Sequence, residues 1–233
     1  MPRPRLASTA AVLALLVASG CDVTGRVERG LEERLPRAIG PADRYSVEVE
    51  GLRARSGEAD RVRVVGENVR PEGAPAIRRL DLDLRGVRYD VGEKRLERVD
   101  GATATARITP AALGAFLESQ GGVREAAVTL RPPDAATVRV RPDIEGVRLP
   151  GGVALEATGR LRSEGGQLRF EVDEVRALGA DLGGYVARRV SDALNPLADL
   201  SGTTPPLTVT AVRVEAGAVV LEATGDLAGL RLR

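Results

Sequence analysis

Residues 102–119 read ATATARITPAALGAFLES, and within this stretch the hydrophobic period changes from two residues to that of a helix. In its first half, small or apolar side chains alternate with Thr and Arg, which predicts a strand with one buried and one solvated face. The alternating positions are Ala102, Ala104, Ala106 and Ile108. Because their side chains are small, they leave a shallow surface on which a helix or an acyl chain can lie closely.

The second half of the stretch predicts a helix. Thr109 is a suitable N-cap, and Pro110 suits the first helical position. The helix presents Leu113, Phe116 and Leu117 on one face. A strand therefore runs directly into an amphipathic helix, and we expect the two elements to share one interior.

The same two-residue period recurs on both sides of this stretch. It predicts about ten strands whose wet faces mix both charge signs, as cross-strand pairing favours. The clearest apolar positions before residue 102 are Tyr45, Val47, Val49, Val62, Val64, Leu80, Leu82 and Leu84. Residues 25–39 and 181–194 have helical spacing instead, and the second of these places Leu182, Tyr185 and Val186 on one face. Many strands with few helices indicate an α+β fold with a large antiparallel sheet.

Composition excludes several classes of protein. The chain has 233 residues, a formal net charge of +1, one cysteine and no histidine. An intrachain disulfide, a histidine-based triad and a histidine metal ligand are therefore excluded. The near-zero charge argues against nucleic acid as a partner. We find no catalytic motif, and the carboxylates of Asp81 and Asp83 alternate with Arg on a wet strand face, so we expect no enzymatic activity, cofactor or metal.

The N-terminus has the pattern of an export signal. Residues 1–20 combine Arg3 and Arg5 with an apolar stretch that is too short for a comfortable membrane span. Small residues then precede Cys21, which resembles the lipidated cysteine of bacterial lipoproteins. We therefore predict a signal peptide over 1–20, a short anchor linker over 21–24 and one domain over 25–233. The mature protein is expected in the cell envelope, exported and anchored to a membrane by Cys21.

The order of elements resembles the LmeA-type phospholipid-binding proteins of bacterial envelopes over residues 25–230. The resemblance begins at the first amphipathic helix and continues through IRRLDLDLRGVRYD (77–90) and ATARITPAALGAFLES (104–119). It ends with ALNPLADLSGTTPPLTVTAVRVEAGAVVLEATG (193–225), where a helix stops at Asn-Pro and leads to paired strands. One departure is the sequence 204–207, Thr-Pro-Pro-Leu, where the family usually has Leu-Pro.

This resemblance implies a tubular lipid-binding (TULIP-like) fold. Such a fold is elongated, with a strongly curved antiparallel sheet that wraps around one or two amphipathic helices and leaves an apolar groove. The resemblance also implies phospholipid as the ligand and a role in lipid handling or envelope maintenance, but it supplies no catalytic residues and no lipid-contact motif. The candidate lipid-binding residues come from the alternating faces instead: Leu82, Leu84, Ala102, Ala104, Ala106, Ile108, Leu113, Phe116, Leu117, Leu182, Tyr185 and Val186.

Two readings of the sequence stay open. In the first, the groove binds phospholipid acyl chains. In the second, the chain is a structural or adaptor lipoprotein that binds another envelope protein through its sheet and has no lipid ligand. Arg-rich strands, such as Arg61-Val62-Arg63, fit either lipid phosphates or a solvated face. The sequence alone does not decide which face of the sheet forms a groove.

Overall fold

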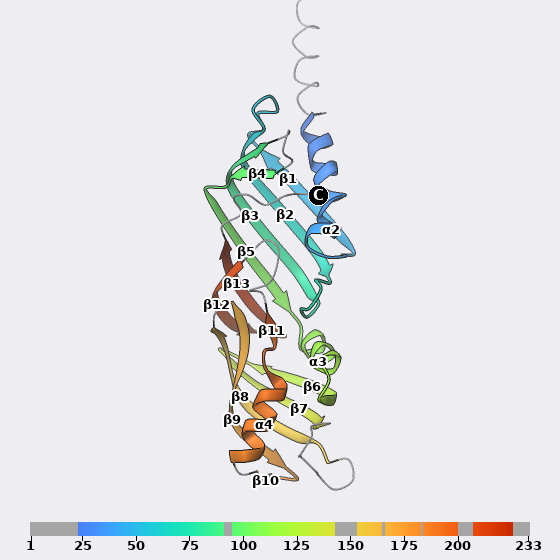
Figure 1. Ribbon diagram of the computed structural model, residues 1–233, viewed down its shortest axis with the longest axis vertical. Helices are drawn as coiled ribbons and strands as arrows, with labels where there is room; N and C mark the ends of the chain where they lie inside the picture. Colours follow the sequence, from blue (N-terminus) through green and yellow to red (C-terminus); the bar gives the residue numbers. More distant parts are fainter. Residues whose placement is uncertain are drawn as a thin grey trace, which may run out of the picture.

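The computed structural model describes residues 23–90, 95–142, 153–164, 166–182, 184–199 and 207–225. They form an elongated molecule in which two antiparallel sheets follow one another along the long axis (Figure 1). The predominance of antiparallel strands over helices confirms the α+β class that the periodicity predicts. The predicted signal peptide and Cys21 lie outside the described residues.

The first sheet has seven strands in the order β1-β2-β3-β5-β13-β12, with β4 paired to β3. Their bounds are β1 (Arg44–Glu50), β2 (Glu58–Val69), β3 (Ile77–Asp90), β4 (Arg95–Arg98), β5 (Gly101–Ile108), β12 (Leu207–Glu215) and β13 (Ala218–Gly225). The alternating apolar residues meet in cross-strand rows, of which one is Val49, Val62, Leu84 and Ala102 and the next is Val47, Val64, Leu82 and Ala104. These rows form one apolar face that runs across four strands.

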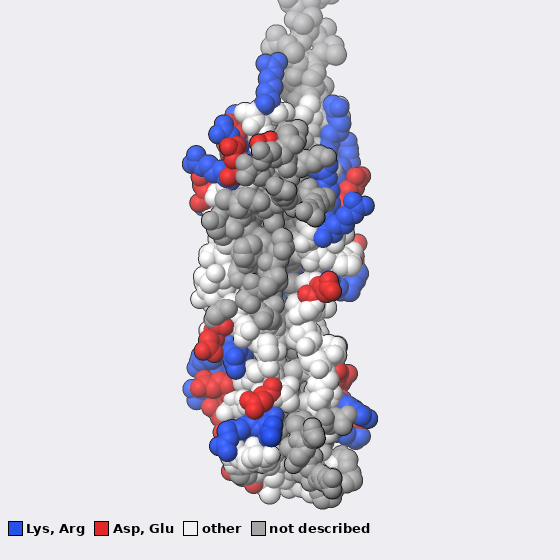
Figure 2. Space-filling model, in the orientation of Figure 1, with Lys and Arg blue, Asp and Glu red and all other residues white. Residues whose placement is uncertain are grey.

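The opposite face of this sheet is charged and solvated. The Arg61 guanidinium donates two hydrogen bonds to the Asp83 carboxylate, one of them from Nε at 2.8 Å. These bonds are the main cause of the lowered pKa of the Asp83 carboxyl. The ionised Asp83 carboxylate therefore stabilises the fold at neutral pH, and this stabilisation is lost as the pH falls through the lowered pKa of Asp83. Figure 2 shows both charge signs mixed along the flanks of the molecule. The strand faces therefore have the polarity that the sequence predicts.

The second sheet has six strands in the order β10-β9-β8-β7-β6, with β11 paired to β9. Their bounds are β6 (Val123–Arg131), β7 (Ala135–Pro142), β8 (Leu155–Glu164), β9 (Gln167–Ala177), β10 (Ala180–Asp181) and β11 (Ala198–Asp199). This sheet adjoins the first through β12, where the amide of Val214 donates to the carbonyl of Pro133 at 2.7 Å.

Two helices close the apolar side of the second sheet. Helix α3 (Pro110–Ser119) packs on β6, and helix α4 (Gly184–Leu194) packs on β9 (Figure 1). The side chain of Asn195, at the end of α4, pairs with Phe170 as a strand residue does. Its Oδ1 accepts from the Phe170 amide at 2.7 Å, and its Nδ2 donates to the Phe170 carbonyl at 2.9 Å. The side chains that α3 and α4 turn inward are almost fully buried: Leu113, Leu117, Val190 and Leu194.

Helix α3 begins as the sequence predicts, with the Thr109 hydroxyl accepting from the Ala112 amide at 3.2 Å. The helix lies close to β6 because Gly114 has no side chain. A Cβ at Gly114 would lie 2.4 Å from the carbonyl oxygen of Ala126, which is far closer than real Cβ atoms approach. The carboxylate of Glu118 also accepts from the Ala126 amide at 2.7 Å, so two contacts hold α3 against this strand.

We expect Gly114→Ala to lower the free energy of unfolding by about 1–3 kcal/mol, because the added methyl group pushes α3 away from β6. Gly101→Ala is the matched control, since a Cβ at Gly101 meets no atom within 4 Å. Denaturant unfolding of both variants measures the difference. Equal stabilities would contradict the close contact between α3 and β6.

Candidate functional site

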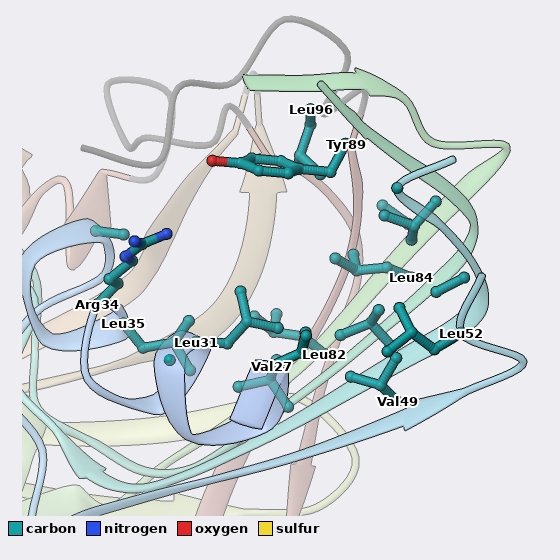
Figure 3. Close-up of a pocket in the computed structure, with 18 of the residues that line it drawn as sticks. Val27, Leu31, Arg34, Leu35, Val49, Leu52, Leu82, Leu84, Tyr89 and Leu96 are labelled. Atoms are coloured by element: carbon teal, nitrogen blue, oxygen red, sulfur yellow. The ribbon is translucent and has the colours of Figure 1, made fainter. Parts of the chain in front are cut away.

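An apolar pocket with a volume of about 440 Å³ lies between the N-terminal helical segment and the apolar face of the first sheet (Figure 3). The N-terminal helical segment comprises a helix over residues 23–32, a turn at 33–34 and the short helix α2 (Leu35–Ala38). It contributes the apolar wall residues Val27, Leu31, Leu35, Ala38 and Ile39. The strands and their connections contribute Val49, Leu52, Ala54, Ala59, Val62, Val64, Leu82, Leu84, Val87, Leu96, Ala102 and Ala104.

Hydrogen bonds to the edge strand β1 hold the helical wall in place. The carboxylate of Glu28 accepts from the Val49 amide at 2.9 Å, and that of Glu32 accepts from the Val47 amide at 3.0 Å. The Tyr45 hydroxyl donates to the carbonyl of Gly40 at 2.8 Å, just beyond α2. Burial raises the pKa of this hydroxyl to about 12, so it stays protonated and able to donate at neutral pH. The segment is thus fixed along the sheet margin.

The floor of the pocket extends along β3 because the strand alternation changes at Gly86. Leu82 and Leu84 line the pocket, and beyond Gly86 the lining residues are Val87 and Tyr89, one position out of phase. Gly86 has φ of +58°, a conformation that glycine adopts without the cost that a side chain brings. The change keeps the apolar face of β3 turned toward the pocket to the end of the strand.

Tyr89 is held at the end of β3 by its backbone. Its amide donates to the carbonyl of Gly57 at 2.8 Å. A Cβ at Gly57 would lie 2.2 Å from the Tyr89 carbonyl oxygen, so this approach requires glycine. The Tyr89 ring borders the pocket with its hydroxyl directed toward the side of the helical segment (Figure 3).

Two alanines of β5 belong to the floor of the pocket, and the next alanine on the same strand does not. Ala102 and Ala104 are 7% and 6% exposed and line the pocket. Ala106 is 8% exposed, belongs to the packed core and lies outside the pocket lining. Substitution at Ala104 and at Ala106 therefore compares a pocket-lining position with a core position on one strand.

The polar residues of the lining lie on the helical segment and at strand ends. Arg26 and Arg34 are the charged residues of the lining within the described part of the chain, and Thr103 and Tyr89 supply hydroxyl groups. The described residues contain no cluster of three or more residues suited to hold a metal ion. No helix among the described residues is long and apolar enough to cross a membrane.

A family model for LmeA-like phospholipid-binding proteins matches residues 23–224. The chain belongs to this family. The match covers both sheets and every pocket residue named above, and it confirms the resemblance on which the sequence analysis relied. Comparison with curated proteins and with solved structures gave no match.

The pocket of this LmeA-like protein brings together one third of the candidate residues that the sequence analysis proposed. They are Leu82, Leu84, Ala102 and Ala104. A second group lies in or beside the packed core around α3, outside the pocket lining: Ala106, Ile108, Leu113, Phe116 and Leu117. A third group lies just before and on α4, over the second sheet: Leu182, Tyr185 and Val186. Four of the twelve residues therefore line the pocket, and the other eight lie outside its described lining.

The sequence does not indicate that the N-terminal helical segment forms a wall of the site. The stripe of Val27, Leu31 and Leu35 shows in the sequence as a helical period, but that period does not reveal that the stripe faces a pocket. Val49, Val62 and Val64 likewise show as strand alternation. Tyr89 gives no such signal, because it follows the change of phase at Gly86.

We expect the double variant Glu28→Ala with Glu32→Ala to loosen the helical wall, because the amides of Val49 and Val47 lose their acceptors. Hydrogen–deuterium exchange should accelerate in residues 23–38 and at these two amides, and each lost bond should cost about 0.5–1.5 kcal/mol. Glu33→Ala is the control, because Glu33 is an exposed residue of the same segment. Unchanged exchange in the double variant would show that apolar packing alone holds the segment.

Proposed function

We propose that this protein is an envelope lipoprotein that binds a phospholipid acyl chain in the pocket of its first sheet. The observation that carries the proposal is an apolar pocket of about 440 Å³ in a member of a phospholipid-binding family. Ligand pockets in proteins have volumes of about 300–1,000 Å³ and are lined mainly by apolar side chains, and this pocket has both properties.

The energetics of such a ligand need no special polar contact in the pocket. Each buried methylene contributes about 0.8 kcal/mol, so even half of one chain supplies substantial affinity. The half-buried side chains of the helical wall would be covered by the chain on binding. Binding without chemical turnover fits a lining made almost wholly of aliphatic side chains.

The proposal includes the tubular lipid-binding arrangement. Its support is the N-terminal helical segment, which lies over the apolar face of a twisted antiparallel sheet and leaves a lined space beneath it (Figures 1 and 3). On the second sheet, α3 and α4 pack against the apolar side, and their inward side chains are almost fully buried. We therefore propose the first sheet as the place of the lipid site.

Membrane anchoring through Cys21 places this site next to its source of lipid. The helix that forms the pocket wall includes residue 23, two residues after Cys21. Two residues of chain span at most about 7 Å, so a lipidated Cys21 would hold the wall at the membrane surface. The protein would then act at the extracytoplasmic face of a membrane, in lipid handling or envelope maintenance.

We expect Ala104→Leu to reduce bound lipid while leaving the melting temperature of lipid-free protein nearly unchanged, because the larger side chain enters pocket space. Ala106→Leu is the matched control on the same strand, and there the change should overpack the core at a cost of about 1–3 kcal/mol. Native mass spectrometry gives the lipid stoichiometry, and thermal melting gives the stability. Full lipid occupancy in Ala104→Leu would place the acyl chain elsewhere, whereas a wild-type protein free of lipid would favour the adaptor role.

We expect Cys21→Ser to release the protein from membranes or to leave an uncleaved precursor, with the domain still folded. The serine hydroxyl replaces the thiol that would carry the lipid. Fractionation and intact mass of the variant measure both results. Membrane association and mass identical to those of the natural protein, apart from the one-atom substitution, would contradict anchoring through this residue.

A further inference from the structure

The charge of the pocket rim has one sign. Arg26 and Arg34 lie eight residues apart on the N-terminal helical segment, and both line the pocket. Gly30 lies midway between them and also lines the pocket, and a Cβ at Gly30 would meet no atom within 4 Å. The rim therefore carries two arginines, with a residue between them that places no side chain in the pocket. No acidic side chain stands among the described residues that line the pocket.

The acidic residues of the same segment are engaged elsewhere. Glu28 and Glu32 direct their carboxylates to the amides of β1, at 2.9 and 3.0 Å. Arg34 is exposed, and it forms no ion pair with any residue in the part of the chain that the structure describes. Many arginines of the strands do form ion pairs, for example Arg61 with Asp83 and Arg141 with Glu125. The Arg34 guanidinium is available to a ligand.

Backbone hydrogen bonds hold both Arg34 and Tyr89, which line the same pocket. Arg34 stands at the turn between the two helices, where its carbonyl accepts from the amides of Arg37 and Ala38 at 3.0 and 3.2 Å. The position of Tyr89 is set by the hydrogen bond from its amide to the Gly57 carbonyl and by the irregular pairing of β3 with β4. Figure 3 shows the Tyr89 hydroxyl directed toward the side where the Arg34 guanidinium lies.

We propose that Arg34 and the Tyr89 hydroxyl bind the phosphate of a lipid whose acyl chain occupies the pocket, and this inference rests on the proposed function. A guanidinium donates two parallel hydrogen bonds to phosphate oxygens, and a phenol donates a third. The acyl chain then extends from this rim between Leu31 and Leu84 over the alanines of β5. Arg26 adds positive charge along the same wall.

Charge complementarity selects phosphate over other headgroup chemistry. A cationic amine finds no acidic partner among the described lining residues, and an uncharged glycerol leaves the guanidinium of Arg34 without a counter-ion. A headgroup with net negative charge meets both the arginines and the hydroxyl. The rim therefore favours anionic phospholipids, and Arg34 is the residue that determines this specificity.

The test compares two amphiphiles that differ only in the phosphate: palmitoyl lysophosphatidate and monopalmitoylglycerol. Both are titrated below their aggregation limits into the purified, delipidated full chain, with binding followed by calorimetry. We expect the natural protein to prefer the phosphate-bearing ligand, and Arg34→Gln to reduce that preference about tenfold or more. Arg34→Lys keeps the positive charge but loses the two parallel donors of the guanidinium, so it should give an intermediate preference. Tyr89→Phe should reduce the preference for the phosphate-bearing ligand about threefold.

Arg37→Gln is the control, because Arg37 is an exposed arginine of α2 that does not line the pocket, and it should keep the full preference. Melting curves check that every variant is folded. Inorganic phosphate alone should compete weakly, because it lacks the chain, and competition as strong as that of lysophosphatidate would mean that the site binds free phosphate instead.

The outcomes separate this inference from the proposed function. Equal binding of both amphiphiles, or a preference that survives in Arg34→Gln, overturns the phosphate site and leaves the acyl pocket standing. Binding of neither amphiphile by the folded natural protein overturns the proposed function itself. A preference that falls equally in Arg34→Gln and Arg37→Gln indicates general surface charge and also overturns the inference.

Discussion

The hydrogen bonds from the amides of Val49 and Val47 to Glu28 and Glu32 join the N-terminal helical segment to the edge strand of the first sheet. They hold the segment along the apolar face, where it forms one wall of the pocket. The middle rows of the sheet, which include Leu82, Leu84 and Ala104, belong to the other side of the pocket lining. The pocket therefore depends on a helical cover that is tied to the margin of the sheet.

In the second sheet, by contrast, the helices are packed against the apolar face. This sheet has the same design, an antiparallel sheet with amphipathic helices on one face, but Val190 and Leu194 of α4 are fully buried against it. The corresponding apolar stripe of the N-terminal segment, Val27, Leu31 and Leu35, is only partly buried. Half-burial of a leucine stripe leaves hydrophobic free energy unrealised, which the proposed acyl chain would recover. One chain thus combines a sheet whose helices are packed against it with a sheet whose helical cover leaves an apolar pocket.

Sequence patterns predicted much of the fold because they depend on local chemistry. Alternation identified the strand faces, and Thr109-Pro110 marked the start of α3. The same patterns could not locate the pocket. Ala104 and Ala106 occupy equivalent positions in the same alternation, and only the tertiary structure shows that one lines the pocket and the other does not. Gly86 shifts the strand phase, so that Val87 and Tyr89 face the pocket against the simple alternation.

The sequence also does not show which arginine borders a pocket. In a chain rich in arginine, Arg34 has no local feature that distinguishes it from Arg61, and only the fold shows that one borders a pocket and the other an aspartate. Residues around α4 were proposed for the site because their helical stripe is strongly apolar. Val190 and Leu194 of that stripe are buried where α4 packs on β9, whereas Tyr185 is 53% exposed.

The attachment of the helical segment to β1 also affects how this protein meets other copies of itself. An uncovered edge strand offers unpaired backbone groups to any other extended chain, and proteins protect such edges to avoid aggregation. Here the protection comes from Glu28 and Glu32, the residues that hold the pocket wall. Any opening of the wall wide enough to uncover β1 would therefore invite strand pairing between neighbouring molecules. Smaller movements of the wall, with the edge kept covered, avoid that hazard.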